Sequence, residues 1–130
     1  MILVDTSIWV DHLSAGDGVL ASLLRHEQVL MHPHVVGELA LGRIPDRALV
    51  LELLHGLPQA EAATDAEVFD FITAQKLEGS GIGYPDAHLL AAARLTPGAS
   101  LWTRDRRLHV LVRRLGLDAG IEPFTGLQED

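Results

Sequence analysis

Short apolar runs alternate along this chain with segments in which apolar residues recur at helical spacing. The clearest runs are residues 1–4, 28–31 and 100–103, with weaker candidates at 59–63 and 121–123. Strands that are separated by helices pair in parallel, and a parallel sheet is covered by its helices on both faces. The pattern therefore predicts an α/β fold with a parallel sheet between two helical layers.

Helix start signals support the same alternation. Thr6 or Ser7 is expected to cap a first helix, and Pro33 and Pro85 stand where later helices begin. The apolar stripe of one helix is expected to include Val68 and Phe69. The expected helices after the first are residues 18–26, 33–42, 46–55, 65–77, 85–94 and 105–115.

Length and composition narrow the class of protein. A chain of 130 residues fits one domain, here residues 1–124, followed by a C-terminal tail at 125–130. Cysteine is absent, which excludes disulfides and thiolate metal sites. We find neither a signal peptide nor an apolar run long enough to cross a membrane, so a cytoplasmic location without membrane association is expected.

Four acidic residues occupy positions that a parallel sheet brings to one edge. Asp5 and Asp105 each follow a predicted strand, while Glu38 and Asp86 lie near the starts of predicted helices. Carboxylates in one pocket repel one another, and a hard divalent cation such as Mg²⁺ or Mn²⁺ relieves that repulsion. Metal sites of this kind serve hydrolysis of phosphodiesters, because the ion polarises the phosphate and activates a water.

Simpler roles exist for each acid taken alone. Asp86 is as well suited to capping a helix as to catalysis, and Asp105 could pair with a neighbouring arginine. Glu38 lies among apolar residues, so we expect it to be partly buried. Asp5 is harder to explain as a cap, because Thr6 and Ser7 are available for that role.

Four ordered segments of the chain resemble the PIN-domain ribonucleases, specifically the VapC-type toxins of bacterial toxin–antitoxin pairs. The segments are residues 2–7, His32-Pro33 followed by Glu38, residues 86–93, and residues 101–105. Their order and separation match the family over nearly the whole chain. Leu108 is a departure, because an aromatic residue is frequent there, and it affects packing rather than chemistry.

The resemblance implies a single PIN-like domain with about five parallel strands. It implies that Asp5, Glu38, Asp86 and Asp105 form the catalytic and metal-binding cluster, and that the hydroxyls of Thr6, Ser7 or Thr103 support it. It also implies Mg²⁺- or Mn²⁺-dependent cleavage of structured RNA, with a tRNA or rRNA loop as the expected target. Inhibition by a cognate VapB-type antitoxin and a homodimeric state are implied as well.

The distribution of charge bears on RNA binding. The net charge is −8, which is unusual for a nucleic-acid binder, but five of the ten basic residues lie at positions 104–114. We expect Arg104, Arg106 and Arg107 to contact RNA, and Arg113 and Arg114 to pair with nearby acids.

Other side chains receive weaker assignments. The histidines lack the spacing of a zinc site, and the glycines at 79, 81 and 83 lack that of a phosphate-binding loop and read as a flexible connection. Two leucine-rich helical faces could leave apolar surface for a protein partner. They comprise Val19, Leu20, Leu23 and Leu24, and Leu49, Leu51, Leu53, Leu54 and Leu57.

Two further functions stay open on the residues alone. A metal-dependent phosphatase could use Asp5 as its nucleophile, although such enzymes usually carry a second acid where this chain has Ser7. A non-catalytic RNA-binding or assembly module with a PIN-like fold is the other alternative. Incubation with RNA in Mg²⁺ or Mn²⁺, compared with EDTA, separates these functions.

Overall fold

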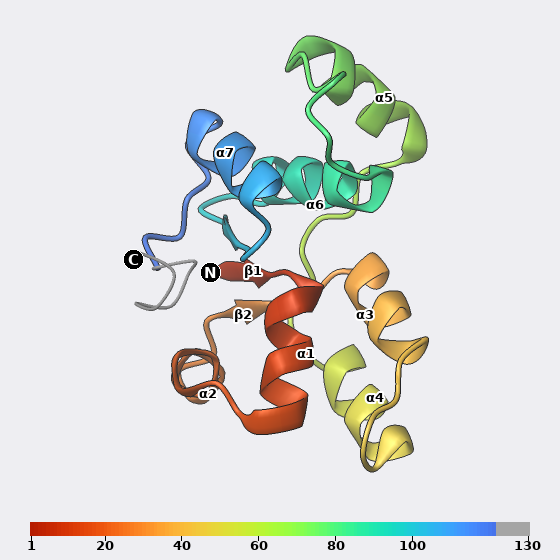
Figure 1. Ribbon diagram of the computed structural model, residues 1–130, viewed down its shortest axis with the longest axis vertical. Helices are drawn as coiled ribbons and strands as arrows, with labels where there is room; N and C mark the ends of the chain where they lie inside the picture. Colours follow the sequence, from red (N-terminus) through yellow and green to blue (C-terminus); the bar gives the residue numbers. More distant parts are fainter. Residues whose placement is uncertain (122–130) are drawn as a thin grey trace.

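The computed structural model describes residues 1–121, in which two helices separate the first strand from the second and four helices separate the second from the third (Figure 1). The strands are β1 (Ile2–Val4), β2 (Val29–Leu30) and β3 (Ser100–Trp102). The helices are α1 (Thr6–Ala15), α2 (Gly18–Arg25), α3 (Pro33–Ala40), α4 (Arg47–His55), α5 (Asp65–Ala74), α6 (Tyr84–Leu95) and α7 (Arg106–Arg114). None of these helices is both long and apolar enough to span a membrane.

The three strands form one parallel sheet in the order β2-β1-β3. Leu3 in the central strand pairs with Leu30 on one side and with Leu101 on the other. The chain passes from β1 to β2 on one side of the central strand, and β3 lies on the other side of it. The carboxyl ends of β1 and β3 therefore flank a topological switch point. Ligand sites of open α/β sheets lie at such points.

The α/β class and the parallel sheet are confirmed, but the sheet is smaller than expected. In place of full outer strands, single parallel bridges join Met31 to Gln59 and Leu101 to Asp118. The expected strand at 59–63 is thus reduced to one bridge. On the other side of the sheet the bridge is formed by Asp118, which precedes the strand predicted at 121–123. Residues 122 and 123 of that strand, and the predicted tail at 125–130, lie outside the described residues.

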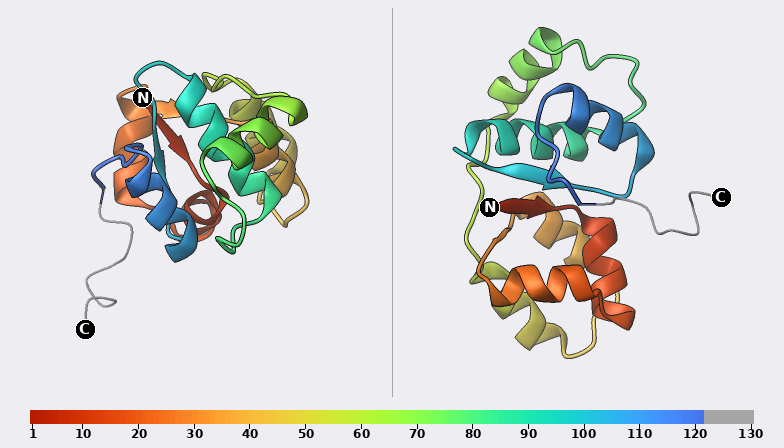
Figure 2. Two further views of the ribbon diagram at one scale, coloured as in Figure 1. Left: turned by 90° about the horizontal axis from the view of Figure 1, so that it is seen from above. Right: turned by 90° about the vertical axis from the view of Figure 1, so that its left-hand side faces the viewer.

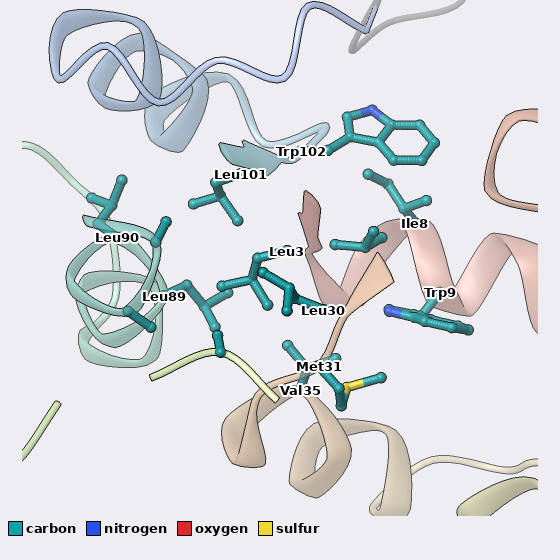
Figure 3. Packing of buried hydrophobic residues seen from close by; sticks show 14 of the residues in the cluster. Leu3, Ile8, Trp9, Leu30, Met31, Val35, Leu89, Leu90, Leu101 and Trp102 are labelled. Atoms are coloured by element: carbon teal, nitrogen blue, oxygen red, sulfur yellow. The ribbon is translucent and has the colours of Figure 1, made fainter. Parts of the chain in front are cut away.

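Helices cover both faces of the sheet, as predicted (Figure 2). In the right-hand view α5, α6 and α7 lie on one side, and α1, α2 and α4 lie on the other. The core fills the space between these layers. Figure 3 shows Leu3, Leu30 and Leu101 from the strands, with Leu89 of α6 on one side and Trp9 of α1 on the other. Burial of these apolar side chains is the main force that holds the helices against the sheet.

Two local expectations are wrong. Asp5 itself caps α1 with its side chain, so Thr6 is the first helical residue and neither Thr6 nor Ser7 is the cap. Phe69 is 63% exposed, although Val68 beside it is fully buried. The reason is that α5 packs mainly against α6, which uses only a narrow stripe of α5 and leaves Phe69 outside it.

Candidate active site

Asp5 lies between the end of β1 and the start of α1, where it is 7% exposed. Its Oδ1 accepts a hydrogen bond from the Thr6 backbone N–H at 2.7 Å, and its Oδ2 accepts one from the Thr103 hydroxyl at 2.7 Å. Burial raises the pKa of Asp5 above its ordinary value, although both hydrogen bonds oppose that rise. The carboxylate is therefore held rigidly, with both oxygens engaged.

Glu38 approaches this region from α3. Its Oε1 accepts a hydrogen bond from the Thr6 hydroxyl at 2.7 Å. Thr6 therefore contacts two acids, Asp5 through its backbone and Glu38 through its side chain. The expected partial burial of Glu38 is wrong: Val35, Val36 and Leu39 take the buried face of α3, which leaves Glu38 exposed.

Asp105 follows β3 and caps α7. Its Oδ1 accepts from the Leu108 backbone N–H at 3.0 Å, and its own N–H donates to the Thr103 hydroxyl oxygen at 3.0 Å. Thr103, which is 1% exposed, thus joins Asp5 and Asp105. Ser7 is exposed on the first turn of α1, and no hydrogen bond described for residues 1–121 links it to the acids.

Asp86 occupies the first turn of α6 and is half-buried. Burial, followed by the negative charges of Asp5, Asp105 and Glu38, raises the pKa of Asp86 to about 6. Thr6 also links Asp5 to Glu38, and Thr103 links Asp5 to Asp105, so three of the acids are joined by direct hydrogen bonds beside Asp86. The structure therefore brings all four predicted acids into one neighbourhood, although they come from four separate parts of the chain.

The donor set suits a hard divalent cation, because all four side chains are carboxylates. Burial, together with the charges of the other three, raises the pKa of Asp86. Within residues 1–121, no three His, Asp or Glu side chains are gathered closely enough to hold a metal ion in the present arrangement. Glu38 is exposed and accepts one hydrogen bond, from the Thr6 hydroxyl, whereas both oxygens of Asp5 accept hydrogen bonds.

Arg104, one of the arginines predicted to contact RNA, is engaged within the protein. Its guanidinium forms ion pairs of 2.6 Å with both Asp11 and Asp17, and it lies 5.6 Å from the centre of the Trp102 ring. Burial alone would raise the pKa of Asp17, but hydrogen bonds from the Leu20 backbone and from Arg104 hold that pKa below its ordinary value. A contact between Arg104 and RNA would have to replace these interactions.

Arg107 is exposed and lies against the glycine-containing loop that precedes α6. Its Nη1 donates to the Gly81 carbonyl oxygen at 3.4 Å, and a Cβ on Gly81 would be only 2.8 Å from the Arg107 Cδ. Gly81 also has a φ of +87°, which favours glycine. The loop that the sequence predicts to be a flexible connection therefore also contacts the Arg107 side chain. Arg106 is also exposed, and Arg114 donates to the Gln75 carbonyl oxygen.

The partners of Arg104 were missed by sequence reasoning. Asp17 carries a recognisable local signal, because it precedes an apolar helical run and its side chain accepts from the Leu20 N–H. That signal identifies a helix cap but cannot identify an arginine 87 residues away. Asp11 carries no local signal at all.

Comparison with known proteins gives a consistent result. The PIN domain matches residues 2–113 of the chain. Two proteins called Ribonuclease VapC32, from Mycobacterium tuberculosis strains CDC 1551 / Oshkosh and ATCC 25618 / H37Rv, are each 45% identical to it over 117 residues. Each alignment covers 90% of this chain and 94% of the relative.

Proposed function

Since this chain belongs to the PIN-domain family, among its VapC-type ribonucleases, we propose that it is a divalent-metal-dependent endoribonuclease and a toxin of a toxin–antitoxin pair. The observation that carries the proposal is geometric: Thr6 links Asp5 to Glu38, and Thr103 links Asp5 to Asp105. Burial and the charges of these three acids also raise the pKa of Asp86 to about 6. A cluster of uncompensated acids is costly to maintain unless it serves to bind a cation.

The four acids have different tasks in this proposal. Asp5 is the rigid ligand, because its two oxygens are oriented by Thr6 and Thr103. Glu38 is the adjustable ligand, because it is exposed and its one side-chain hydrogen bond described within residues 1–121 comes from the Thr6 hydroxyl.

Asp86 and Asp105 complete the donor set from the first turn of α6 and the cap of α7. A bound Mg²⁺ or Mn²⁺ supplies the Lewis acidity that polarises a phosphate and lowers the pKa of a water. The contribution of the protein is to place these oxygens at the carboxyl edge of the sheet, where an RNA strand has access.

The phosphatase alternative is disfavoured by the surroundings of Asp5. A phosphatase of this kind usually carries a second acid two residues after its nucleophile, where this chain has Ser7, and no hydrogen bond described for residues 1–121 links Ser7 to the acids. The alternative of a non-catalytic module is tested by the cleavage experiment below.

The proposed substrate is structured RNA, cleaved in an accessible loop such as one of tRNA or rRNA. Single-stranded loops expose both backbone and bases, whereas the deep groove of an RNA helix excludes side chains. The proposed RNA contacts are Arg104, Arg106 and Arg107. Arg107 is better placed for RNA than Arg104, because Arg104 already pairs with Asp11 and Asp17.

We propose that a VapB-type antitoxin binds an apolar cavity beside the acids. The cavity has a volume of about 490 Å³ and lies between α1, α3 and the segment before α4, with Val10, Leu13 and Ile44 among its lining residues. Glu38 also lines it, so a bound segment would end near the carboxylates. An apolar helix or extended segment ending in Arg or Lys would fit both features. Part of the leucine-rich surface also remains uncovered, including Leu49 and Leu53 of α4.

RNA cleavage with Mg²⁺ or Mn²⁺, compared with EDTA, is the main test. Asp5→Asn should reduce the cleavage rate by about 10²-fold or more, since it removes one charge while keeping the shape. Asp46→Asn is the matched control, because Asp46 forms no side-chain cap and lies outside the acid cluster. Equal activity of the two variants, or full activity in EDTA, would refute the metal-dependent mechanism.

The toxin assignment has its own test. Expression of the chain alone should arrest growth, and co-expression with a short protein encoded beside it should restore growth and yield a stable complex. Persistent arrest without a complex would refute the antitoxin proposal and leave the nuclease proposal intact. The predicted homodimer is checked by the molar mass in solution, and the predicted cytoplasmic location by cell fractionation.

A further inference from the structure

Three histidine rings lie together beside the acid cluster. His32 caps the start of α3, His34 lies in the first turn of α3, and His88 lies in α6. The ring centres of His34 and His88 are 4.4 Å apart, and those of His32 and His34 are 5.3 Å apart with nearly parallel planes. None of the roles proposed above uses these side chains.

His88 is anchored from a third helix. Its Nε2 lies 3.0 Å from Oδ1 of Asp65, the first residue of α5, and the same oxygen accepts a hydrogen bond from the Tyr84 hydroxyl at 2.7 Å. The Tyr84 ring also meets the His88 ring edge to face at 4.7 Å. Since His88 is 4% exposed and held on two sides, its ring has little freedom to rotate.

His32 forms the other side of the group. It is 1% exposed, and its Nδ1 accepts from the His34 backbone N–H at 3.0 Å, so a neutral ring carries its proton on Nε2. That Nε2 finds no hydrogen-bond partner among residues 1–121. Burial lowers the pKa of His32 to about 4, with the neighbouring His34 and His88 contributing, so the ring is neutral near pH 7. His34 therefore packs between two side chains that are fixed in place.

The contact between His34 and His88 lies where α3 packs against α6. Each of these helices also supplies one acid. Glu38 is four residues after His34, on the same face of α3, and Asp86 is two residues before His88 in α6. Loss of one of these two rings would change how closely α3 and α6 approach each other. The distance between Glu38 and Asp86 would change with it.

We infer that His34 and His88 form a positioning pair that sets the distance between the Glu38 and Asp86 carboxylates for ion binding. The inference rests on the proposed function, since it assumes that these acids bind a divalent ion. Its physical basis is that a metal site needs its ligands held by a supporting shell, and that loss of supporting contacts typically weakens ion binding by 10- to 100-fold.

The test is Mn²⁺ binding alone, measured by titration calorimetry on the full-length chain. His34→Ala should weaken Mn²⁺ binding by about tenfold, while His34→Phe, which keeps a planar ring against His88, should bind within about threefold of the unmodified protein. Leu20→Ala is the control for simple destabilisation, because Leu20 is fully buried in α2, a helix that carries none of the four acids.

Four outcomes are decisive. Mn²⁺ binding by His34→Ala as tight as that of the unmodified protein would overturn the inference. An equal loss of Mn²⁺ affinity in His34→Ala and Leu20→Ala, once the difference in their thermal stabilities is taken into account, would overturn it as well. Absence of Mn²⁺ binding by the unmodified chain would instead refute the metal dependence of the proposed function, and the inference would fall with it. Loss in His34→Ala with rescue by His34→Phe supports the positioning role.

Discussion

The Thr103 hydroxyl donates to Asp5 Oδ2 over 2.7 Å, which joins two residues 98 positions apart. The same hydroxyl oxygen accepts from the Asp105 N–H at 3.0 Å. One buried side chain at the end of β3 thus orients an acid at the end of β1 and another at the start of α7. The geometry of the site depends on this contact between neighbouring strands.

Replacement of Thr103 tests that relationship. Thr103→Val keeps the shape but removes both hydrogen bonds, so the free energy of unfolding should fall by about 1–3 kcal/mol and RNA cleavage should fall with it. Thr103→Ser retains the hydroxyl and should keep most of both. Chemical denaturation and cleavage assays make the comparison, and a Val variant equal to the Ser variant would contradict it.

Binding of Mn²⁺ should depend on pH through Asp86. Its pKa of about 6 means that a proton competes with the ion below pH 6, whereas above pH 7 the carboxylate is already ionised. If one proton is displaced, affinity should be about tenfold lower at pH 5 than at pH 7. Calorimetry at both values measures this. An unchanged affinity would show that Asp86 is not a ligand.

Asp86 should also destabilise the protein in the absence of metal. Its pKa is raised in the folded state, so folding binds a proton between about pH 4 and 6, and stability should decline as pH rises through that window. Asp86→Asn should increase the free energy of unfolding at pH 7.5 by roughly 1 kcal/mol, after allowance for solvent screening of this half-buried group. Denaturation in EDTA tests this, and a less stable Asn variant would contradict it.

Arg104 and Arg107 should respond differently to truncation. Arg107→Ala should reduce the slope of log affinity against log salt by about 0.7, the value for one lost phosphate contact on single-stranded RNA. Arg104→Ala should leave that slope unchanged and lower stability by about 1 kcal/mol, because it breaks the pairs with Asp11 and Asp17. RNA binding at several salt concentrations and thermal denaturation distinguish the two. A smaller slope in Arg104→Ala together with an unchanged slope in Arg107→Ala would show that Arg104, and not Arg107, contacts the RNA.

A charge placed in the apolar cavity should block the protein partner. Val10 lines that cavity and is 52% exposed, so Val10→Glu should weaken antitoxin binding by at least tenfold without impairing the fold. Val19→Glu, at a similarly exposed valine of α2 outside the cavity, is the matched control. Both variants should still cleave RNA. If Val10→Glu and Val19→Glu bind the antitoxin with equal affinity, the antitoxin binds outside this cavity.

Local patterns in the sequence were sufficient to predict the fold class and the approach of Asp5 to Asp105 at one edge of the sheet. Strands read as apolar runs because a parallel strand is buried on both faces, and acids that follow such runs meet because parallel strands end at a common edge. The positions of Asp5 and Asp105 follow from that rule. The number of strands does not follow from that rule. Each outer segment pairs through a single bridge, and its apolar run is too short to distinguish a strand from a bridge.

The tertiary structure alone decided which side chains contact one another across the chain. It placed the Arg104 guanidinium on Asp11 and Asp17, and it placed His88 against Asp65. A sequence pattern reports burial and capping within a turn or two, because those depend on neighbours along the chain. Contacts between residues tens of positions apart depend on how whole helices pack on the sheet, and that packing is a property of all the elements together.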